Sequence, residues 1–497
     1  MSFFSTRGGA CVTASQAVLY GLAHDGGLFV PSMFPTVTQE RLSALCQTGY
    51  RNQAARILRA FLEDYSIAEI EQTVDAAYGD GWDDPAVAPV RTLTENIHVL
   101  ELFHGPTLAF KDVALKILPH LMRLAAQKNG EEREISILAA TSGDTGKAAL
   151  EGFRDVPGTS CTAFYPLGGV SRVQELQMTT TQGRNTHVIG VKGNFDQAQT
   201  GVKRIFADAS LRDELARRGI VLSSANSINF GRLAPQVVYY FTAYTDLVAR
   251  GVVRMGQNVN FVVPTGNFGD ILAGYYAKRM GLPIKRLICA SNRNNVLTDF
   301  FSDGIYYTHR TFFKTLSPSM DILISSNLER LLYESADRDA ALVSSWMELL
   351  SASGSFSIGA QRLAQLRKTF WAGYADDVMT AAEIRRVYER SHYVLDPHSA
   401  VGSHVLNEYR AQTGDHTAAV LVCTASPYKF ASDVAASLLG AEAVEGWDML
   451  QCAQKLEELS GVPVPEQVRS LATLPVRHKA TCEPQGMAQA LLAELSN

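Results

Sequence analysis

Residues 260–270 read Asn-Phe-Val-Val-Pro-Thr-Gly-Asn-Phe-Gly-Asp and contain the clearest strand–turn–helix junction of the chain. The apolar run predicts a buried strand, and the residues from 270 to about 280 predict a helix. The turn between them, Gly266-Asn267-Phe268-Gly269, would direct several backbone N–H groups and the positive end of the helix dipole toward one point. A phosphate fits such a turn, and the same tetrapeptide would serve equally well as a tight turn that binds nothing.

Further β-rich runs recur along the chain, and most are followed by a turn of small residues and then a helix. The predicted strands cover residues 134–140, 160–166, 186–191, 220–223, 285–290 and 418–423. Repeated βαβ alternation predicts an α/β fold with parallel sheets and helices on both faces. In such sheets ligands collect in the loops at the carboxyl ends of the strands. One long helix is expected from about 194 to 218, and the chain after residue 423 is expected to be helical to its end.

A second junction of this kind holds the run Thr141-Ser142-Gly143-Asp144-Thr145-Gly146. Its Gly-Lys end invites comparison with the nucleotide-binding P-loop, but the first glycine and the final Ser/Thr of that motif are missing. The remaining feature is a turn rich in hydroxyls and amides at a helix start. Such a turn suits a carboxylate or another small anion, whereas a simple N-cap would need only one hydroxyl.

Lys111 stands at the start of a strongly apolar predicted helix. Cations are disfavoured near helix N-termini and costly to bury, and desolvation lowers the pKa of a lysine. A lysine with a lowered pKa can form a Schiff base or act as a base. Two ordinary alternatives stay open, since the amine can reach solvent or can pair with Asp112.

A third polar loop, 226–232, follows the predicted strand 220–223. Asn226, Ser227 and Arg232 offer an amide, a hydroxyl and a guanidinium, and arginine is a natural partner for phosphate or carboxylate. A capped helix start with Arg232 on a solvated face is the open alternative.

The composition limits the possible functions. The 497 residues are 46% apolar and 19% charged, which predicts a large buried core in two to four domains. A net charge of −5 gives no basic field for nucleic acid or an anionic membrane. Seven cysteines without a C-x-x-C pair favour a reducing compartment, so we expect a cytoplasmic protein. No apolar run is long enough to cross a membrane, and no histidine or cysteine cluster predicts a metal site.

A buried-lysine candidate, a glycine loop for phosphate and an anion-binding turn on parallel α/β units together suggest a pyridoxal-phosphate (PLP) enzyme. The chain resembles the fungal and bacterial threonine synthases, within the tryptophan-synthase-β-like PLP enzymes. The resemblance covers nearly the whole chain and is carried by residues 25–31, 105–112, 142–146, 226–229, 264–270 and 424–430. One departure is Ser426, where the family pattern has histidine.

The resemblance implies a role for each of these residues. Lys111 would hold PLP as a Schiff base, and Thr424 would lie against the pyridine nitrogen of the cofactor. The cofactor phosphate would bind at Gly266, Asn267, Phe268, Gly269 and Asp270. The substrate would be bound by Thr141, Ser142, Asp144 and Thr145 around its carboxylate, and by Asn226, Ser227 and Arg232 around its phosphate.

The implied reaction converts O-phospho-L-homoserine and water to L-threonine and phosphate. A threonine-synthase-like phospholyase that releases 2-oxobutyrate and ammonia would share every motif. A threonine or serine dehydratase would not need a second phosphate site, and a non-catalytic anion binder would not need Lys111 with both loops.

The implied architecture has two parallel-sheet α/β lobes and a mostly helical N-terminal accessory domain. We expect the accessory domain at 1–95, the catalytic core at 96–440 with a smaller lobe at about 135–225, and a C-terminal helical segment at 441–497. Monomer and homodimer both stay open.

Overall fold

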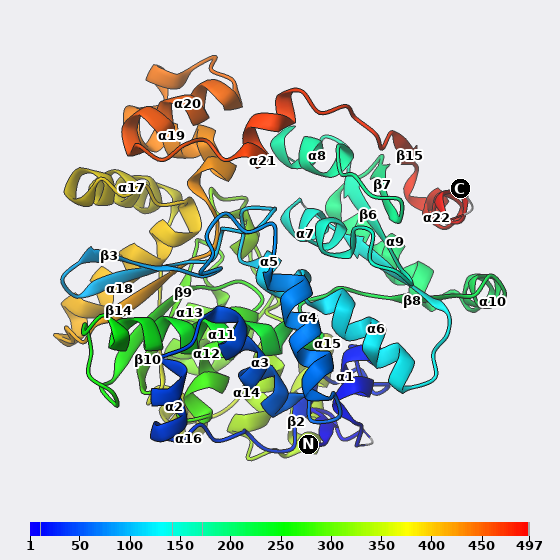
Figure 1. Cartoon of the computed structure of the whole chain (residues 1–497), viewed down its shortest axis with the longest axis horizontal. Coiled ribbons are helices and arrows are strands. Elements are labelled where there is room, and N and C mark those ends of the chain that lie inside the picture. The colour runs from blue at the N-terminus through cyan, green and yellow to red at the C-terminus, as the bar shows by residue number, and fades with distance from the viewer. Residues whose placement is uncertain (10, 142, 171, 496–497) are drawn as a thin grey trace.

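Two parallel sheets organise the computed structural model, which describes residues 1–9, 11–141, 143–170 and 172–495. The larger sheet has the order β13-β10-β9-β14-β4-β3, and the smaller has the order β15-β7-β6-β5-β8. Figure 1 shows the larger sheet at lower left and the smaller one at upper right. All neighbouring strands within the two sheets run parallel except β3 and β4.

The strands of the larger sheet are β3 Val90–Thr94, β4 Ile97–Glu101, β9 Val259–Pro264, β10 Ile284–Ser291, β13 Phe370–Tyr374 and β14 Ala419–Cys423. Those of the smaller sheet are β5 Glu134–Ala140, β6 Thr159–Pro166, β7 Thr186–Val191, β8 Ile220–Ser223 and β15 Ala480–Cys482. The predicted strands are confirmed, and β5, β7 and β8 have the predicted bounds. Strands β6, β9 and β14 are buried along their whole length, because helices cover both faces of a parallel sheet.

The helices around the site connect these strands. They are α5 Lys111–Leu115, α6 Leu118–Lys128, α7 Asp144–Phe153, α8 Arg172–Thr179, α9 Phe195–Ala207, α10 Ala209–Arg217, α11 Phe230–Ala249 and α12 Gly269–Arg279. The single long helix expected over 194–218 is wrong. Asp208 is extended and caps α10, since its side chain accepts from the N–H of Leu211.

The N-terminal part is mostly helical and packs on the same core as the larger sheet. It contains β1 Phe3–Ser5, α1 Ala14–Tyr20, β2 Phe29–Pro31, α2 Gln39–Leu45, α3 Tyr50–Phe61 and α4 Ile67–Tyr78. Strands β1 and β2 form a small antiparallel sheet of their own. The expected domain boundary at residue 95 falls inside the β3–β4 hairpin.

The region from 292 to 390 adds short elements to the larger lobe. They are α13 Val296–Asp303, β11 Ile305–Tyr307, η1 Pro318–Met320, α14 Leu328–Ser335, α15 Ala340–Ser353, β12 Ser355–Ser357, α16 Ala360–Leu366 and α17 Asp377–Ser391. Helix α18 follows at Pro397–Thr413, and the side chain of Asp396 caps it. Across the described residues, no helix combines the length and apolar character of a membrane span.

The last part of the chain is not helical throughout, contrary to the expectation. Its elements are η2 Pro427–Phe430, α19 Ala431–Leu439, η3 Glu442–Val444, α20 Met449–Ser460, α21 Glu466–Arg469, η4 Ser470–Ala472, β15, η5 Pro484–Gly486 and α22 Met487–Glu494. Strand β15 pairs with β7 and so extends the smaller sheet. Met487 and Leu491 of α22 then complete the apolar cluster beside α9. The C-terminal segment therefore joins the smaller lobe after α19 and α20 have packed on the larger one.

This attachment predicts the effect of Leu491→Ala. Leu491 is fully buried, so its truncation should lower the free energy of unfolding by about 2–4 kcal/mol. Urea denaturation measures the change. Leu349 is 50% exposed, and Leu349→Ala is the control, with an expected change below about 0.5 kcal/mol. Equal effects of the two substitutions would show that α22 contributes nothing to the core.

Candidate active site

The loop before α5 and the loop after β14 are joined by backbone hydrogen bonds. The N–H of Phe110 donates to the carbonyl of Thr424 at 2.8 Å, and the N–H of Ser426 donates to the carbonyl of Leu108 at 3.0 Å. These bonds place Thr424, which is 6% exposed, beside the start of α5 at Lys111. Two stretches more than 300 residues apart in the sequence thus meet at the carboxyl end of the larger sheet.

Lys111 is buried, and neither ordinary alternative for its amine is observed. Its Nζ lies 3.2 Å from Ser319 Oγ and 4.0 Å from the carboxylate of Asp144. Asp112 instead accepts from the N–H and the hydroxyl of Thr107, at 2.8 and 2.6 Å. Burial lowers the pKa of Lys111 to about 8, despite the opposing effect of Asp144.

Asp144 has a second lysine partner that the sequence analysis missed. Lys429, whose side chain is fully buried, lies 3.0 Å from Asp144 and also donates to the carbonyl of Thr107. The hydroxyl of Ser319 donates to the other oxygen of Asp144 at 3.0 Å. Burial alone would raise the pKa of Asp144, but Lys429 and Lys111 hold it well below its usual range. Asp144 therefore carries a negative charge that balances two buried amines.

His398 is another residue of this cluster without a predicted role. Its Nε2 accepts from the backbone N–H of Ser319 at 3.2 Å, and its Nδ1 lies 2.8 Å from Asp396. Accepting at Nε2 requires a lone pair there, so the proton sits on Nδ1 and faces Asp396. An Asp-Pro-His run is by itself typical of a helix start, with Asp396 as the cap and Pro397 at the first position. The position of His398 beside Ser319 comes from the tertiary fold.

The glycine loop between β9 and α12 has the geometry that its sequence predicts. Among the described residues, the backbone N–H groups of Gly266, Asn267, Phe268 and Gly269 have no hydrogen-bond acceptor. Phe268 adopts a left-handed conformation with φ of 63°. A Cβ atom on Gly266 would approach the carbonyl of Ser319 to 2.7 Å, so only glycine fits at that position. The loop thus offers a row of free donors at a helix N-terminus.

Asp270 has a different surrounding from the rest of this loop. Its carboxylate accepts from the hydroxyls of Tyr239 and Tyr240 at 2.6 and 2.8 Å. Burial raises the pKa of Asp270 to about 6, although both hydrogen bonds oppose the shift. These contacts attach the start of α12 to α11.

The turn before α7 is organised by Thr141. Its hydroxyl oxygen accepts from the N–H groups of Gly143 and Gly146, both at 2.9 Å. Thr145 is half-buried, and Ser142 lies outside the described residues.

Arg232 is buried, which excludes the alternative of a solvated face. Its Nη1 donates to the carbonyl of Ala225 at 2.9 Å, whereas its Nε has no partner among the described residues. Burial lowers the pKa of Arg232 to about 10, so the guanidinium stays charged at neutral pH. Asn226 is exposed and Ser227 half-buried in the loop that precedes α11. A buried charge with a free donor is what an anion site requires.

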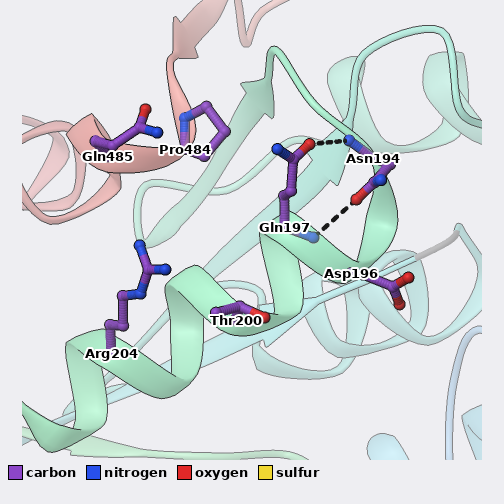
Figure 2. A pocket seen from close by; sticks show the side chains of 7 residues that line it. All are labelled: Asn194, Asp196, Gln197, Thr200, Arg204, Pro484 and Gln485. Atoms are coloured by element: carbon purple, nitrogen blue, oxygen red, sulfur yellow. Dashed lines mark hydrogen bonds between the residues drawn. The ribbon is translucent and has the colours of Figure 1, made fainter.

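A surface pocket of about 340 Å³ lies away from these residues (Figure 2). It is lined by α9 and by the turn that follows β15, and none of the predicted site residues lines it. Asn194 and Gln197 at its edge form the capping box of α9, in which their side-chain oxygens accept from each other's backbone N–H groups.

Comparison with known proteins identifies the family. The family model for the threonine synthase N terminus matches residues 2–78, and that for pyridoxal-phosphate dependent enzymes matches residues 87–425. The threonine synthase of Pseudomonas aeruginosa is 42% identical over 442 residues, which cover 88% of this chain and 91% of that protein. The chain belongs to the threonine synthase family. The resemblance seen in the sequence is thereby confirmed.

Human threonine synthase-like 1 is 41% identical over 435 residues, which cover 85% of this chain but 58% of that longer protein. Solved structures confirm the expected fold class. The PLP-bound threonine synthase from Brucella melitensis has a TM-score of 0.87 at 39% identity, covering 100% of this chain and 99% of that one. Yeast threonine synthase has a TM-score of 0.89 at 34% identity with the same coverage.

Proposed function

We propose that the chain is a threonine synthase that binds PLP and converts O-phospho-L-homoserine and water to L-threonine and phosphate. The observation that carries the proposal is a buried lysine, Lys111, linked to two separate sets of free anion donors. The amine of Lys111 contacts Ser319, whose carbonyl packs against Gly266, and the charge of Arg232 is near enough to act on the pKa of Lys111. One set is the row of unpaired N–H groups at 266–269, and the other is the buried guanidinium of Arg232. A phosphorylated cofactor and a phosphorylated substrate need two such sites. Membership of the threonine synthase family supports the same conclusion.

The residues at the first site fit PLP. Lys111 has the lowered pKa of an amine that bonds to an aldehyde, and the loop 266–269 has free donors for a phosphate. Thr424 has a neutral hydroxyl, and its backbone carbonyl accepts from the N–H of Phe110, the residue before Lys111. We propose that this hydroxyl faces the pyridine nitrogen. The side chain of Asp270 is held by two tyrosines, so we propose that only the backbone at Asp270 belongs to the phosphate loop. PLP, when bound, supplies an electron sink that acidifies the neighbouring C–H bonds of an amino acid.

The remaining predicted residues would bind the substrate. We propose that Thr141, Ser142 and Thr145 bind its carboxylate, and that Asn226, Ser227 and Arg232 bind its phosphate. We propose a different role for Asp144. Because its carboxylate is charged and paired with Lys429, we propose that it neutralises the lysines and does not contact the substrate carboxylate.

Lys111 would move protons during the reaction. Its amine lies within reach of Ser319 and near Asp144, which orient it in the buried site. A pKa near 8 allows the same group to accept and release a proton close to neutral pH. Arg232 would hold the phosphate while it leaves Cγ, and water would add at Cβ.

The lowered pKa of Lys111 gives a testable pH dependence. Bonding to an aldehyde requires the neutral amine, and that fraction grows as the pH rises toward and past the pKa. The rate at which cofactor-free protein gains its PLP absorption band should therefore rise with pH through about 8. A rate still climbing steeply above pH 9.5 would indicate an ordinary lysine. Stopped-flow absorbance at a series of pH values measures the rate.

The phospholyase alternative uses the same contacts and differs only in its products. The test supplies O-phospho-L-homoserine to the purified protein and identifies what is formed. Threonine with an equal amount of phosphate supports our proposal, 2-oxobutyrate without threonine selects the phospholyase, and no turnover selects a non-catalytic binder.

A cytoplasmic location is a further proposal, based on the free cysteines.

The domain division is also a proposal. We place the boundary between the accessory domain and the core within 79–86, between the two family matches and ahead of the β3–β4 hairpin. We assign β15 and α22 to the smaller lobe.

A further inference from the structure

One short segment, residues 325–330, contacts the backbone of both proposed phosphate loops. The hydroxyl of Ser325 donates to the carbonyl of Gly266 at 2.7 Å. The side-chain amide of Asn327 donates to the carbonyl of Asn267 at 3.1 Å and to that of Ser227 at 3.3 Å. Both loops are therefore held through their carbonyl oxygens by the same segment.

Arg330 completes this arrangement from the first turn of α14. It is 0% exposed, and its guanidinium donates to the carbonyl of Ile228 at 2.6 Å and to the side-chain oxygen of Asn327 at 2.5 Å. Its Nε donates to the carbonyl of Phe29 at 2.9 Å, in β2 of the N-terminal part. Among the described residues, each hydrogen bond of Arg330 goes to a neutral oxygen, so these bonds fix the positions of the acceptor groups and do not neutralise the guanidinium.

The N-terminal part holds the same helix from its other side. Glu329 accepts from the hydroxyl of Thr6 at 2.6 Å and from the guanidinium of Arg7 at 2.8 Å. Glu329 is 6% exposed, so these bonds are shielded from water. The accessory domain thus fixes the start of α14, and through it the 325–330 segment.

Fixing a carbonyl also fixes the next N–H group along the chain. In a planar trans peptide the C=O of one residue and the N–H of the following residue point in opposite directions. Holding the carbonyls of Gly266 and Asn267 therefore turns the N–H groups of Asn267 and Phe268 away from the 325–330 segment. These are two of the four free donors of the cofactor loop. Holding the carbonyl of Ser227 acts in the same way on the N–H of Ile228, which also has no acceptor among the described residues.

We propose that Asn327 is a positioning residue that orients the anion-binding backbone of both phosphate loops, with Ser325 acting on the cofactor loop alone. This inference rests on the proposed function, because it takes the two loops as the sites of the cofactor phosphate and the substrate phosphate. The inference also gives the accessory domain a role in the activity, because that domain holds the 325–330 segment, which contacts both loops.

The experiment compares the holoenzyme of wild type with two variants. Asn327→Ala should release PLP during dialysis about fivefold faster or more, and should raise KM for O-phospho-L-homoserine by a similar factor. Ser325→Ala should speed PLP release but leave KM unchanged. Loss of the absorption band measures release, so one readout does not depend on turnover.

Asn185→Ala is the matched control. Asn185 lies in the smaller lobe, donates to the carbonyls of Phe153 and Thr159, and accepts from a backbone N–H, as a counterpart of the three bonds of Asn327. It should lower Tm without changing PLP release or KM.

Equal PLP release and KM in wild type and Asn327→Ala would overturn the inference, and so would equal changes in Asn327→Ala and Asn185→Ala. If Asn327→Ala does not fold, unchanged PLP release in Ser325→Ala overturns it. A wild-type protein without the PLP band would instead overturn the proposed function.

Discussion

Lys111→Ala is expected to lower turnover of O-phospho-L-homoserine by about 10³-fold or more and to remove the visible PLP absorption band. The reason is that Lys111 is the buried amine that contacts Ser319, whose carbonyl packs against Gly266 of the glycine loop, and that follows Phe110, which is bonded to the backbone of Thr424. Its loss removes both the covalent attachment of the cofactor and the group proposed to move protons. Lys429 cannot replace it, because its amine is bound to Asp144 and to the carbonyl of Thr107. Absorbance of the purified protein and a phosphate-release assay measure the two effects.

Lys116→Ala is the matched control for this prediction. Lys116 follows Lys111 at the end of the same helix, and burial also lowers its pKa. Its amine has no place in the proposed site, so the band and the turnover should stay within about threefold of wild type. A Lys111→Ala protein that keeps its band, or that loses no more activity than Lys116→Ala, would contradict the assignment of Lys111.

Arg232→Gln is expected to raise KM for O-phospho-L-homoserine by about 10²-fold, with a smaller change in kcat. A buried guanidinium with an unpaired Nε binds a phosphate through charge-assisted hydrogen bonds, and glutamine supplies neither the charge nor that donor. Steady-state kinetics with the phosphorylated substrate give both constants. PLP release should stay unchanged, because the cofactor phosphate is assigned to the other loop.

Arg410 offers a control of similar chemistry. Its Nε is also buried without a partner among the described residues, and its Nη2 donates to the carbonyl of Asn96 at 2.9 Å. Arg410 lies near the C-terminal end of α18, about three turns beyond His398. Arg410→Gln should leave KM unchanged. An unchanged KM in Arg232→Gln would remove Arg232 from the phosphate site.

The sheets were predictable because their strands are apolar on both faces and end in glycine-rich or polar turns. Strands β5, β7 and β8 therefore appear with the predicted bounds. The break at Asp208 was harder to see, since its capping hydrogen bond interrupts a stretch that is otherwise helical in character. Strand β15 was missed because it has three residues, and only the free edge of β7 makes it a strand.

The candidate site also contains some residues that could be predicted from the sequence and others that could not. Lys111, Arg232 and the glycine loop were predictable because each carries a local signal, such as a charge in an apolar setting or glycines after a strand. Ser319, Lys429 and His398 carry no such signal. Ser319 reaches Lys111, Lys429 reaches Asp144 and His398 reaches Ser319 only when η1, η2 and α18 pack at the carboxyl end of the larger sheet. Contacts between residues this far apart in the sequence depend on the whole fold.

Product analysis of the reaction with O-phospho-L-homoserine in oxygen-18 water tests the central claim most directly. Our account predicts L-threonine that carries one oxygen-18 atom in its hydroxyl group, together with an equal amount of unlabelled phosphate, because water adds at Cβ after phosphate leaves Cγ. Mass spectrometry distinguishes these products. Formation of 2-oxobutyrate without threonine, or label in the phosphate, would contradict the account.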